Sequence, residues 1–591
     1  MKNRSEIAPE FTWDLSHIFA TQEAWEAAYA DCEAGMAKIP GLRGRIGRSP
    51  EELKAVYDEV YAYQQKLMRV GEYAFLSKAL DGGDVNAQKM CDRVITLETR
   101  VMAGMAFLEP ELMAIPEETL SAWLKLPELA GYRHILEDAT RLRAHVLDEK
   151  SEAMMARFGR ITGTASDVYD MLTNVEMQWP VIKGEDGSDV TVTPGMFHPL
   201  RESKVKAVRD AAFAAMFGEY GKFNNTLATI YGGSVKKDNL LADLRGYSSA
   251  RAASLSRNNV PESVYDALIT AVRGAVPSME KYLALRAKAL KTENLDVYDL
   301  YVPIVEGVDW PMSYEEAKDL VIKAVAPLGE EYQNVLREAY ANRWIDVYET
   351  PGKESGAFSA GIYGVHPYVK LNFAGTLDDA FTLAHELGHS MHSYRSSAAQ
   401  DFANHDYSLL VAEVASTVNE VLLTKYLLSV ETDPKRRAYV LNHFLEGFRT
   451  TVFRQTLFAE FEYKAHQAEQ AGTPLTAEFL NQLYARLVKD YYPTAAMREE
   501  LKYEWSFIPH FYNNFYVYVY ATGFCSAVAI ASGIVESGDA SAYLKFLSTG
   551  GSDYPINELK IAGIDLTSPA VVANAMKVFD ESIDELAELI G

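Results

Sequence analysis

The sequence predicts a mainly α-helical fold with a few short strands. Two observations carry this prediction: apolar residues return at the helical period over long stretches, and strand signals are confined to two places. The clearest helical stretches are residues 24–36, 50–80, 86–107 and 435–471. No internal repeat or low-complexity linker interrupts them, so we expect a globular, helix-rich chain.

The chain is long enough for two lobes. At 591 residues it exceeds an ordinary single domain. Residues 179–183, the turn-like residues 184–187 and residues 190–192 together predict a β-hairpin. We place this hairpin at the end of an N-terminal helical lobe, residues 1–195, which is followed by a second lobe, residues 196–591.

The charge balance excludes some classes of partner. Lys and Arg number 57 against 82 Asp and Glu, which gives a formal net charge of −25, and no Lys- or Arg-rich block is present. We therefore expect neither nucleic acid nor a membrane surface as a partner. Three cysteines at long, unpatterned spacings suit no disulfide framework and favour a reducing cytoplasm. The N-terminal residues show no apolar signal-peptide core, so we expect no export.

One segment is long enough to raise the question of a membrane span. Residues 515–535 carry no charged side chain. However, tyrosines alternate in the first half of the segment, glycines and serines are spread through the second, and a polar run precedes it. We therefore predict a buried segment beside a polar site rather than a membrane span.

A short motif points to metal chemistry. His385, Glu386 and His389 form a His-Glu-x-x-His pattern in a stretch that Thr376 can cap as a helix. Two histidines four residues apart on a helix project from one face and can bind one zinc ion. Glu386 then lies beside the open position of the metal, where it can accept a proton from water. The pattern also arises by chance, so a third ligand is needed to support it.

The third ligand must come from elsewhere in the chain. His392 lies seven residues from His385, roughly 10.5 Å along a helix, and cannot easily share the same ion. The remaining candidates are Asp401, His405, Asp406, Glu413 and Glu420. We select Glu413, because it stands in an apolar helix where a metal would compensate an otherwise costly carboxylate. Glu420 could hydrogen-bond a ligand histidine, or it could be a partly solvated helix glutamate.

Two other segments could complete the site. Residues 510–520 concentrate imidazole and hydroxyl donors, which stabilise an oxyanion, although the same residues could form aromatic core. Residues 357–373 could supply a sheet edge for an extended peptide. Gly361 and Gly364 would let a backbone approach there, although a bulged strand in a small sheet explains them equally well.

Together, these residues resemble the thimet-oligopeptidase-like metallopeptidases and, within them, the oligoendopeptidase F branch. The resemblance covers nearly the whole chain. It rests on separated motifs that occur in the same order, at residues 11–16, 244–250, 361–373, 385–389, 412–416 and 508–512.

The resemblance implies a large helical ellipsoid with a deep substrate channel, small β-sheets near the site and a zincin-like catalytic core in residues 196–591. It implies one zinc ion, with His385, His389 and Glu413 as ligands and Glu386 as the general base. The expected substrates are short, unfolded peptides that are cut at internal bonds. A dipeptidyl carboxypeptidase and a catalytically silent peptide-binding protein are the alternatives.

The resemblance also points to residues that would stabilise the reaction intermediate. His510 corresponds to the histidine of the family that contacts the intermediate. For the tyrosine that acts with it we select Tyr518, followed by Tyr516 and Tyr512. The expected substrate-binding residues are Gly361, Tyr363, Gly364, Tyr512 and Tyr516.

Overall fold

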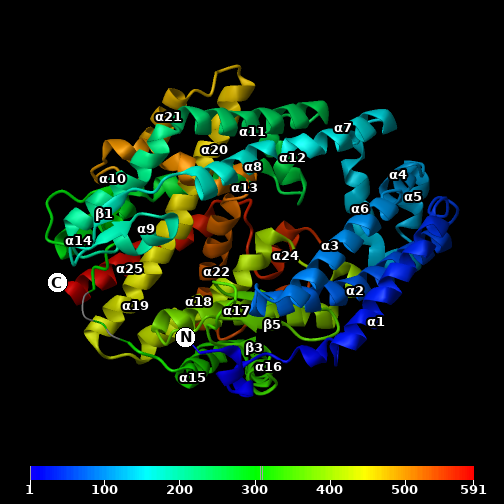
Figure 1. Cartoon of the computed structure of the whole chain (residues 1–591), viewed down its shortest axis with the longest axis horizontal. Coiled ribbons are helices and arrows are strands. Elements are labelled where there is room, and N and C mark those ends of the chain that lie inside the picture. The colour runs from blue at the N-terminus through cyan, green and yellow to red at the C-terminus, as the bar shows by residue number, and fades with distance from the viewer. Residues whose placement is uncertain (1, 306–307, 309) are drawn as a thin grey trace. The chain divides into compact units, whose positions relative to one another are not determined.

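The computed structural model describes residues 2–305, 308 and 310–591. Helices dominate these residues, and the strands form two small sheets (Figure 1), which confirms the predicted mainly helical fold. The backbone contacts divide the chain into two units. Unit 1 comprises Met1–Ala144, Trp310–Tyr426 and Ile530–Ile564, and unit 2 comprises His145–Asp309, Leu427–Ala529 and Asp565–Gly591. The boundary predicted at residue 195 falls inside unit 2, and a division of the chain at that point stays a prediction.

Unit 1 contains the first helices of the chain and those around the predicted motif. Its helices are α1 (Gln22–Gly35), α2 (Pro50–Leu80), α3 (Val85–Met105), α4 (Leu108–Met113), α5 (Glu117–Trp123), α6 (Arg133–Arg141), α15 (Tyr314–Ala324), α16 (Glu330–Ala341), α17 (Leu377–Ala399), most of α18 (Leu409–Val430), α23 (Ser541–Phe546) and α24 (Pro555–Ile561). The helices predicted at residues 24–36, 50–80 and 86–107 are confirmed as α1, α2 and α3.

The start of α2 shows how the sequence sets a helix end. Ser49 caps the helix by accepting a hydrogen bond from the backbone N–H of Glu52, and Pro50 occupies the first helical position. Buried apolar residues then return every three or four positions, so one side of α2 packs against α1 and α3. Figure 1 shows α2 and α3 lying side by side.

A three-stranded sheet lies in unit 1 just before the motif in the sequence. Its order is β3 (Ile345–Asp346), β5 (Tyr368–Lys370) and β4 (Phe358–Ala360), with β5 parallel to β3 and antiparallel to β4. The strand signal at residues 357–373 therefore resolves into β4, a turn and β5, and Gly364 takes a φ of 72° in that turn. Among the described residues β4 is an edge strand, so one side of its backbone has no strand partner.

The two faces of β4 meet different helices. Ser359 lies on one face, where its Oγ is 2.8 Å from Oγ of Ser390 on α17. Phe358 lies on the other face, where its ring centroid is 5.3 Å from that of Phe75 on α2. The sheet therefore separates α17 from α2 at this edge.

Unit 2 contains the predicted hairpin and the remaining helices. Strands β1 (Val181–Lys183) and β2 (Asp189–Thr191) pair antiparallel, which confirms the hairpin. The helices are α7 (Glu149–Thr162), α8 (Thr164–Met171), α9 (Pro194–Arg201), α10 (Lys206–Lys222), α11 (Asn224–Leu244), α12 (Ala250–Ser256), α13 (Glu262–Gly274), α14 (Val276–Ala289), α19 (Pro434–Gly447), α20 (Arg454–Gln470), α21 (Ala477–Tyr491), the first part of α22 (Tyr518–Ser537) and α25 (Ala570–Ile590). A π-helical segment, Phe448–Phe453, joins α19 to α20 within the stretch predicted at residues 435–471.

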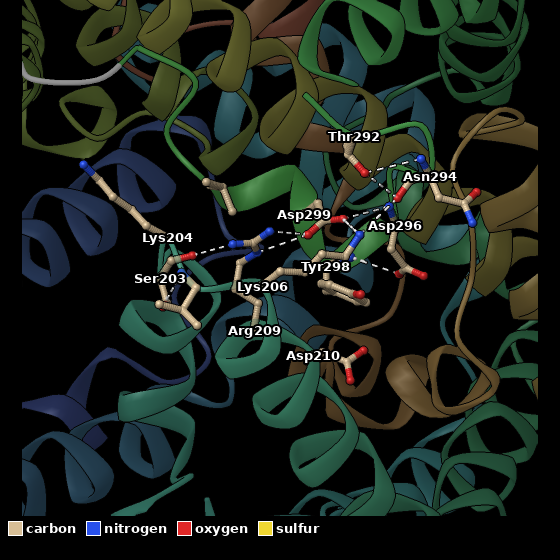
Figure 2. A network of polar contacts seen from close by, with 12 residues as sticks. Ser203, Lys204, Lys206, Arg209, Asp210, Thr292, Asn294, Asp296, Tyr298 and Asp299 are labelled. Atoms are coloured by element: carbon tan, nitrogen blue, oxygen red, sulfur yellow. Dashed lines mark hydrogen bonds and ion pairs between the residues drawn. The ribbon is translucent and has the colours of Figure 1, made fainter. Parts of the chain in front are cut away.

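A buried ion pair fixes the 3₁₀ helix Val297–Tyr301 to α10 within unit 2 (Figure 2). Asp299 is 1% exposed and accepts hydrogen bonds of 2.6 and 3.1 Å from the guanidinium of Arg209. Arg209 also donates to the backbone carbonyl of Ser203, and Lys206 Nζ lies 3.4 Å from the second Asp299 oxygen. Because a buried carboxylate is costly without such partners, these contacts hold the segment in place.

Helix α22 corresponds to the long uncharged segment of the sequence. Among the described residues it is the one helix that is long and apolar enough to cross a membrane by length and composition, and 72% of its most apolar window is buried. Core helices of globular proteins pass the same test, so this burial agrees with the predicted buried segment. The three cysteines, Cys32, Cys91 and Cys525, are free and buried.

Candidate metal centre

Helix α17 presents the predicted motif from its middle turns. Thr376 caps the helix: its Oγ1 accepts a hydrogen bond from the backbone N–H of Asp379, and the Asp379 carboxylate accepts one in return from the backbone N–H of Thr376. Both partners lie in the sequence where the helix start was expected. His385 and His389 consequently project from one face of α17 on successive turns, as the spacing predicts.

The three predicted ligands converge within unit 1. His385 Nε2 lies 3.4 Å and His389 Nε2 lies 3.6 Å from Oε2 of Glu413 on α18, and the two Nε2 atoms are 3.2 Å apart. Donors at ordinary zinc–ligand distances of about 2.0–2.1 Å in a tetrahedral site are separated by roughly 3.3 Å. The donor set and its spacing therefore fit one zinc ion, and among the described residues this is the cluster that could hold a metal ion.

Glu420 lies beside the first ligand, in the place that the sequence suggested. Its carboxylate is hydrogen-bonded to Nδ1 of His385, which leaves Nε2 of that ring directed at Glu413 and His389. Carboxylates in this position fix the orientation of a ligand imidazole. Burial lowers the pKa of His385, but the hydrogen bond and negative charge of Glu420 outweigh burial and raise it to about 9.

Glu386 is next to His385 in the sequence, but its side chain does not belong to the cluster of His385, His389 and Glu413. It is 6% exposed. Burial, reinforced by the negative charges of Glu413 and Glu420 and opposed by His385 and Lys370, raises its pKa to about 7. A carboxylate whose pKa lies near neutrality can both accept and return a proton, which is the property that a general base needs.

Two residues that the sequence analysis missed hold α17 against α18. Asn419 donates a hydrogen bond of 3.0 Å from Nδ2 to the backbone carbonyl of Ala384, and Tyr332 donates to Oδ1 of Asn419. Gly388 lies at the crossing itself, where an added Cβ would be 2.5 Å from Cα of Ser416. A glycine in a helix interior is the sequence signal that could have indicated such a close approach.

The other side chains considered for the third ligand have different surroundings. His392 is fully buried, and its ring stacks on Tyr407 at a centroid distance of 3.6 Å. His405 bonds through Nδ1 to the backbone carbonyl of Phe402. Neither histidine, and neither Asp401 nor Asp406, joins the metal cluster of the described residues.

His510 belongs to unit 2, whereas the three predicted metal ligands belong to unit 1. Within unit 2, the rings of Tyr516 and Tyr520 gather near His510, at centroid distances of 6.4 and 6.1 Å. Tyr520 was not among the predicted residues. Its spacing of four residues from Tyr516 places the two rings 5.2 Å apart near the start of α22.

The other two predicted tyrosines pack into unit 2. Tyr518 is 3% exposed and its ring lies 5.4 Å from that of Tyr265. Tyr512 packs against Tyr169, with a centroid distance of 4.7 Å. Burial raises the pKa of both hydroxyl groups above the ordinary value. The predicted roles of Tyr512 and Tyr518 stay predictions.

The three residues predicted on the substrate strand lie in the turn between β4 and β5. An added Cβ at Gly361 would be 2.5 Å from Cβ of Ser393, so this glycine permits contact with α17. Tyr363 donates its hydroxyl to the backbone carbonyl of Gln400, and Arg69 approaches Gly364. The contacts of these three residues therefore hold the turn in place. The strand edge that has no partner belongs to β4, which precedes the turn. A role for these residues in substrate binding stays a prediction.

Comparison with known proteins places these features in a family. Residues 199–578 match the model of peptidase family M3, and residues 111–179 match that of oligopeptidase F. Oligopeptidase PepF of Bacillus subtilis is 43% identical over 100% of this chain and 89% of that protein. Among solved structures, one from Chlamydophila abortus has a TM-score of 0.93 at 31% identity and covers both chains completely. Oligoendopeptidase F from Enterococcus faecium has a TM-score of 0.74 at 35% identity, covering 96% of this chain and 99% of that one.

Proposed function

The chain belongs to peptidase family M3, in its oligoendopeptidase F branch, and we propose that it uses one zinc ion to hydrolyse internal bonds of short peptides. Because it belongs to this family, the protein is a metallo-oligopeptidase. The observation that carries the finer proposal is the spacing of the donor atoms of His385, His389 and Glu413, which lie 3.2–3.6 Å apart. Two imidazoles and a carboxylate are a zinc-type donor set.

In the proposed reaction a zinc ion held by these ligands would polarise the scissile carbonyl and lower the pKa of a water molecule. Glu386 accepts a proton from the attacking water and delivers it to the leaving amine. Glu420 holds the ring of His385 in the orientation that ligation requires. Each of these roles is carried by a side chain of unit 1.

We assign the oxyanion donors to the aromatic cluster of His510, Tyr516 and Tyr520. Tyr518 was selected from the sequence, but its burial against Tyr265 supports the two neighbouring tyrosines instead. Their imidazole and hydroxyl groups are of the kind that stabilises a tetrahedral intermediate. The substrate peptide would extend the sheet along the open edge of β4. The free, buried cysteines suit a reducing compartment, and we place the enzyme in the cytoplasm.

An internally quenched peptide with both termini blocked tests the proposal. We expect the purified enzyme to cut it, activity to disappear after dialysis against a chelator, and zinc to restore activity. Mass spectrometry of the products identifies the bond. A dipeptidyl carboxypeptidase would cut only a matched peptide with a free C-terminus, so failure on the blocked peptide alone would replace our proposal with that activity.

A further inference from the structure

A groove of about 810 Å³ lies between α2 and α3 of unit 1. It follows one side of each helix, over residues 64–79 of α2 and 91–102 of α3. Most of its lining is apolar, and three large apolar side chains on it are exposed: Phe75 by 45%, Ile95 by 59% and Met102 by 75%. Apolar surface gathered in this way on a globular protein marks an interaction site more often than scattered apolar residues do.

Three glutamates line this groove: the exposed Glu354, and Glu72 and Glu98, which lie deeper. Glu72 on α2 and Glu98 on α3 are half-buried, and neither has a hydrogen bond or ion pair within the described part of the chain. The Glu98 carboxylate lies against α2 next to Glu72, since a Cβ added at Gly71 would be 3.4 Å from its Oε1. Burial, followed by the charges of Glu98 and Asp406, raises the pKa of Glu72 to about 7, and burial raises the pKa of Glu98.

The neighbouring cations do not balance these carboxylates. Arg69, also on α2, donates instead to the backbone carbonyls of Tyr363 and Gly364. Lys78 is the one basic residue of the described lining, against three glutamates. The groove therefore combines an apolar surface with an excess of carboxylates. Burying a carboxylate without a cationic partner costs free energy, and a bound cation would offset that cost.

The groove adjoins the strand that the substrate is proposed to extend. Phe75 contacts Phe358 of β4, and Lys370 Nζ lies 5.0 Å from the centroid of the Phe358 ring. A peptide paired with the open edge of β4 would point alternate side chains to the two faces of the sheet. Those on the Phe358 face emerge on the side of α2, where Phe75 forms the rim of the groove.

We infer that this groove is a subsite for a basic side chain of the substrate, whose stem lies along Phe75 and Ile95 and whose charge lies between Glu72 and Glu98. The inference rests on the proposed function, because it takes β4 as the strand on which the peptide lies. Lysine and arginine suit the groove, since their long apolar stems can cover apolar walls while the charged head reaches the carboxylates.

Paired peptides test the subsite. We would use blocked, internally quenched peptides that carry lysine or norleucine at one position, moved through each position in turn. At one position at least, we expect kcat/KM to favour lysine by about tenfold, the effect of one charge-assisted contact. In the Glu72→Gln/Glu98→Gln variant the ratio should fall to about one. The control is Asp92→Asn, an exposed carboxylate on α3 outside the groove, which should keep the wild-type ratio.

Two results would overturn the subsite: equal kcat/KM for both peptides at every position, or a tenfold preference that survives in the double variant. If the double variant does not fold, the single variants Glu72→Gln and Glu98→Gln replace it, and each should reduce the ratio. If the wild type cuts neither peptide, the proposed function fails. Fluorescence anisotropy with labelled peptides then tests the subsite separately. The lysine peptide should still bind about tenfold more tightly than the norleucine peptide, and equal binding would exclude the subsite.

Discussion

Replacing Gly388 by alanine tests the contact that brings the ligands of α17 and α18 together. An added Cβ would lie 2.5 Å from both the backbone oxygen of Ala415 and Cα of Ser416, whereas ordinary contact begins at 3.4 Å. The obstructing atoms are backbone, so no side chain can rotate away. The two helices would have to separate locally by nearly 1 Å, and Glu413 lies within three residues of both obstructing positions.

This displacement exceeds what a metal site tolerates. Zinc–ligand distances hold to within about 0.2 Å, and misplacement by about 1 Å can reduce turnover about a hundredfold. Overpacking at the crossing should also cost about 1–3 kcal/mol of unfolding free energy. We therefore expect Gly388→Ala to bind zinc at least tenfold more weakly and to lose about two orders of magnitude in kcat.

Zinc affinity can be measured by competition with a chromophoric chelator, and stability by urea unfolding of the metal-free protein. The matched control is Gly233→Ala on α11, where an added Cβ meets nothing within 4 Å. That variant should be more stable by up to about 1 kcal/mol, because alanine is the better helix former. If Gly388→Ala keeps the zinc affinity and the stability of the wild type, the contact of Gly388 with α18 does not position the ligands.

Substitutions at three further residues test the individual roles. Glu386→Gln should retain zinc but lose about 10²–10⁴-fold in kcat, because the amide cannot accept the proton; turnover near the wild-type rate would remove Glu386 from the mechanism. Glu413→Ala should lose its zinc on dialysis, and a full equivalent of metal after dialysis would disprove the third ligand. Glu420→Ala should weaken zinc binding about 10–100-fold through loss of the hydrogen bond to His385, with Glu420→Gln retaining part of the affinity; equal affinity in all three proteins would contradict that role.

Local sequence patterns were enough to predict the helix that holds His385 and His389. The cap at Thr376 and the four-residue spacing of His385 and His389 predicted their helix and their shared face, since both depend on contacts within one or two turns. The hairpin at residues 181–191 followed from turn residues between two short runs. Glu413 was selected from the cost of its charge in an apolar helix, and its convergence with the two histidines agrees with that choice.

Only the tertiary structure decided how separate segments meet. Among the alternating tyrosines of residues 516–520 the resemblance favoured Tyr518, whereas the structure buries Tyr518 and brings the rings of Tyr516 and Tyr520 near His510. The sequence likewise could not reveal that each unit combines three separate stretches of the chain, or that a groove lies between α2 and α3. Periodicity and capping act over a few residues, whereas these features depend on which surfaces of distant segments pack together. The sequence by itself therefore determined the family, the helical fold and the ligand motif, and packing decided the crossing at Gly388 and the surroundings of Glu72 and Glu98.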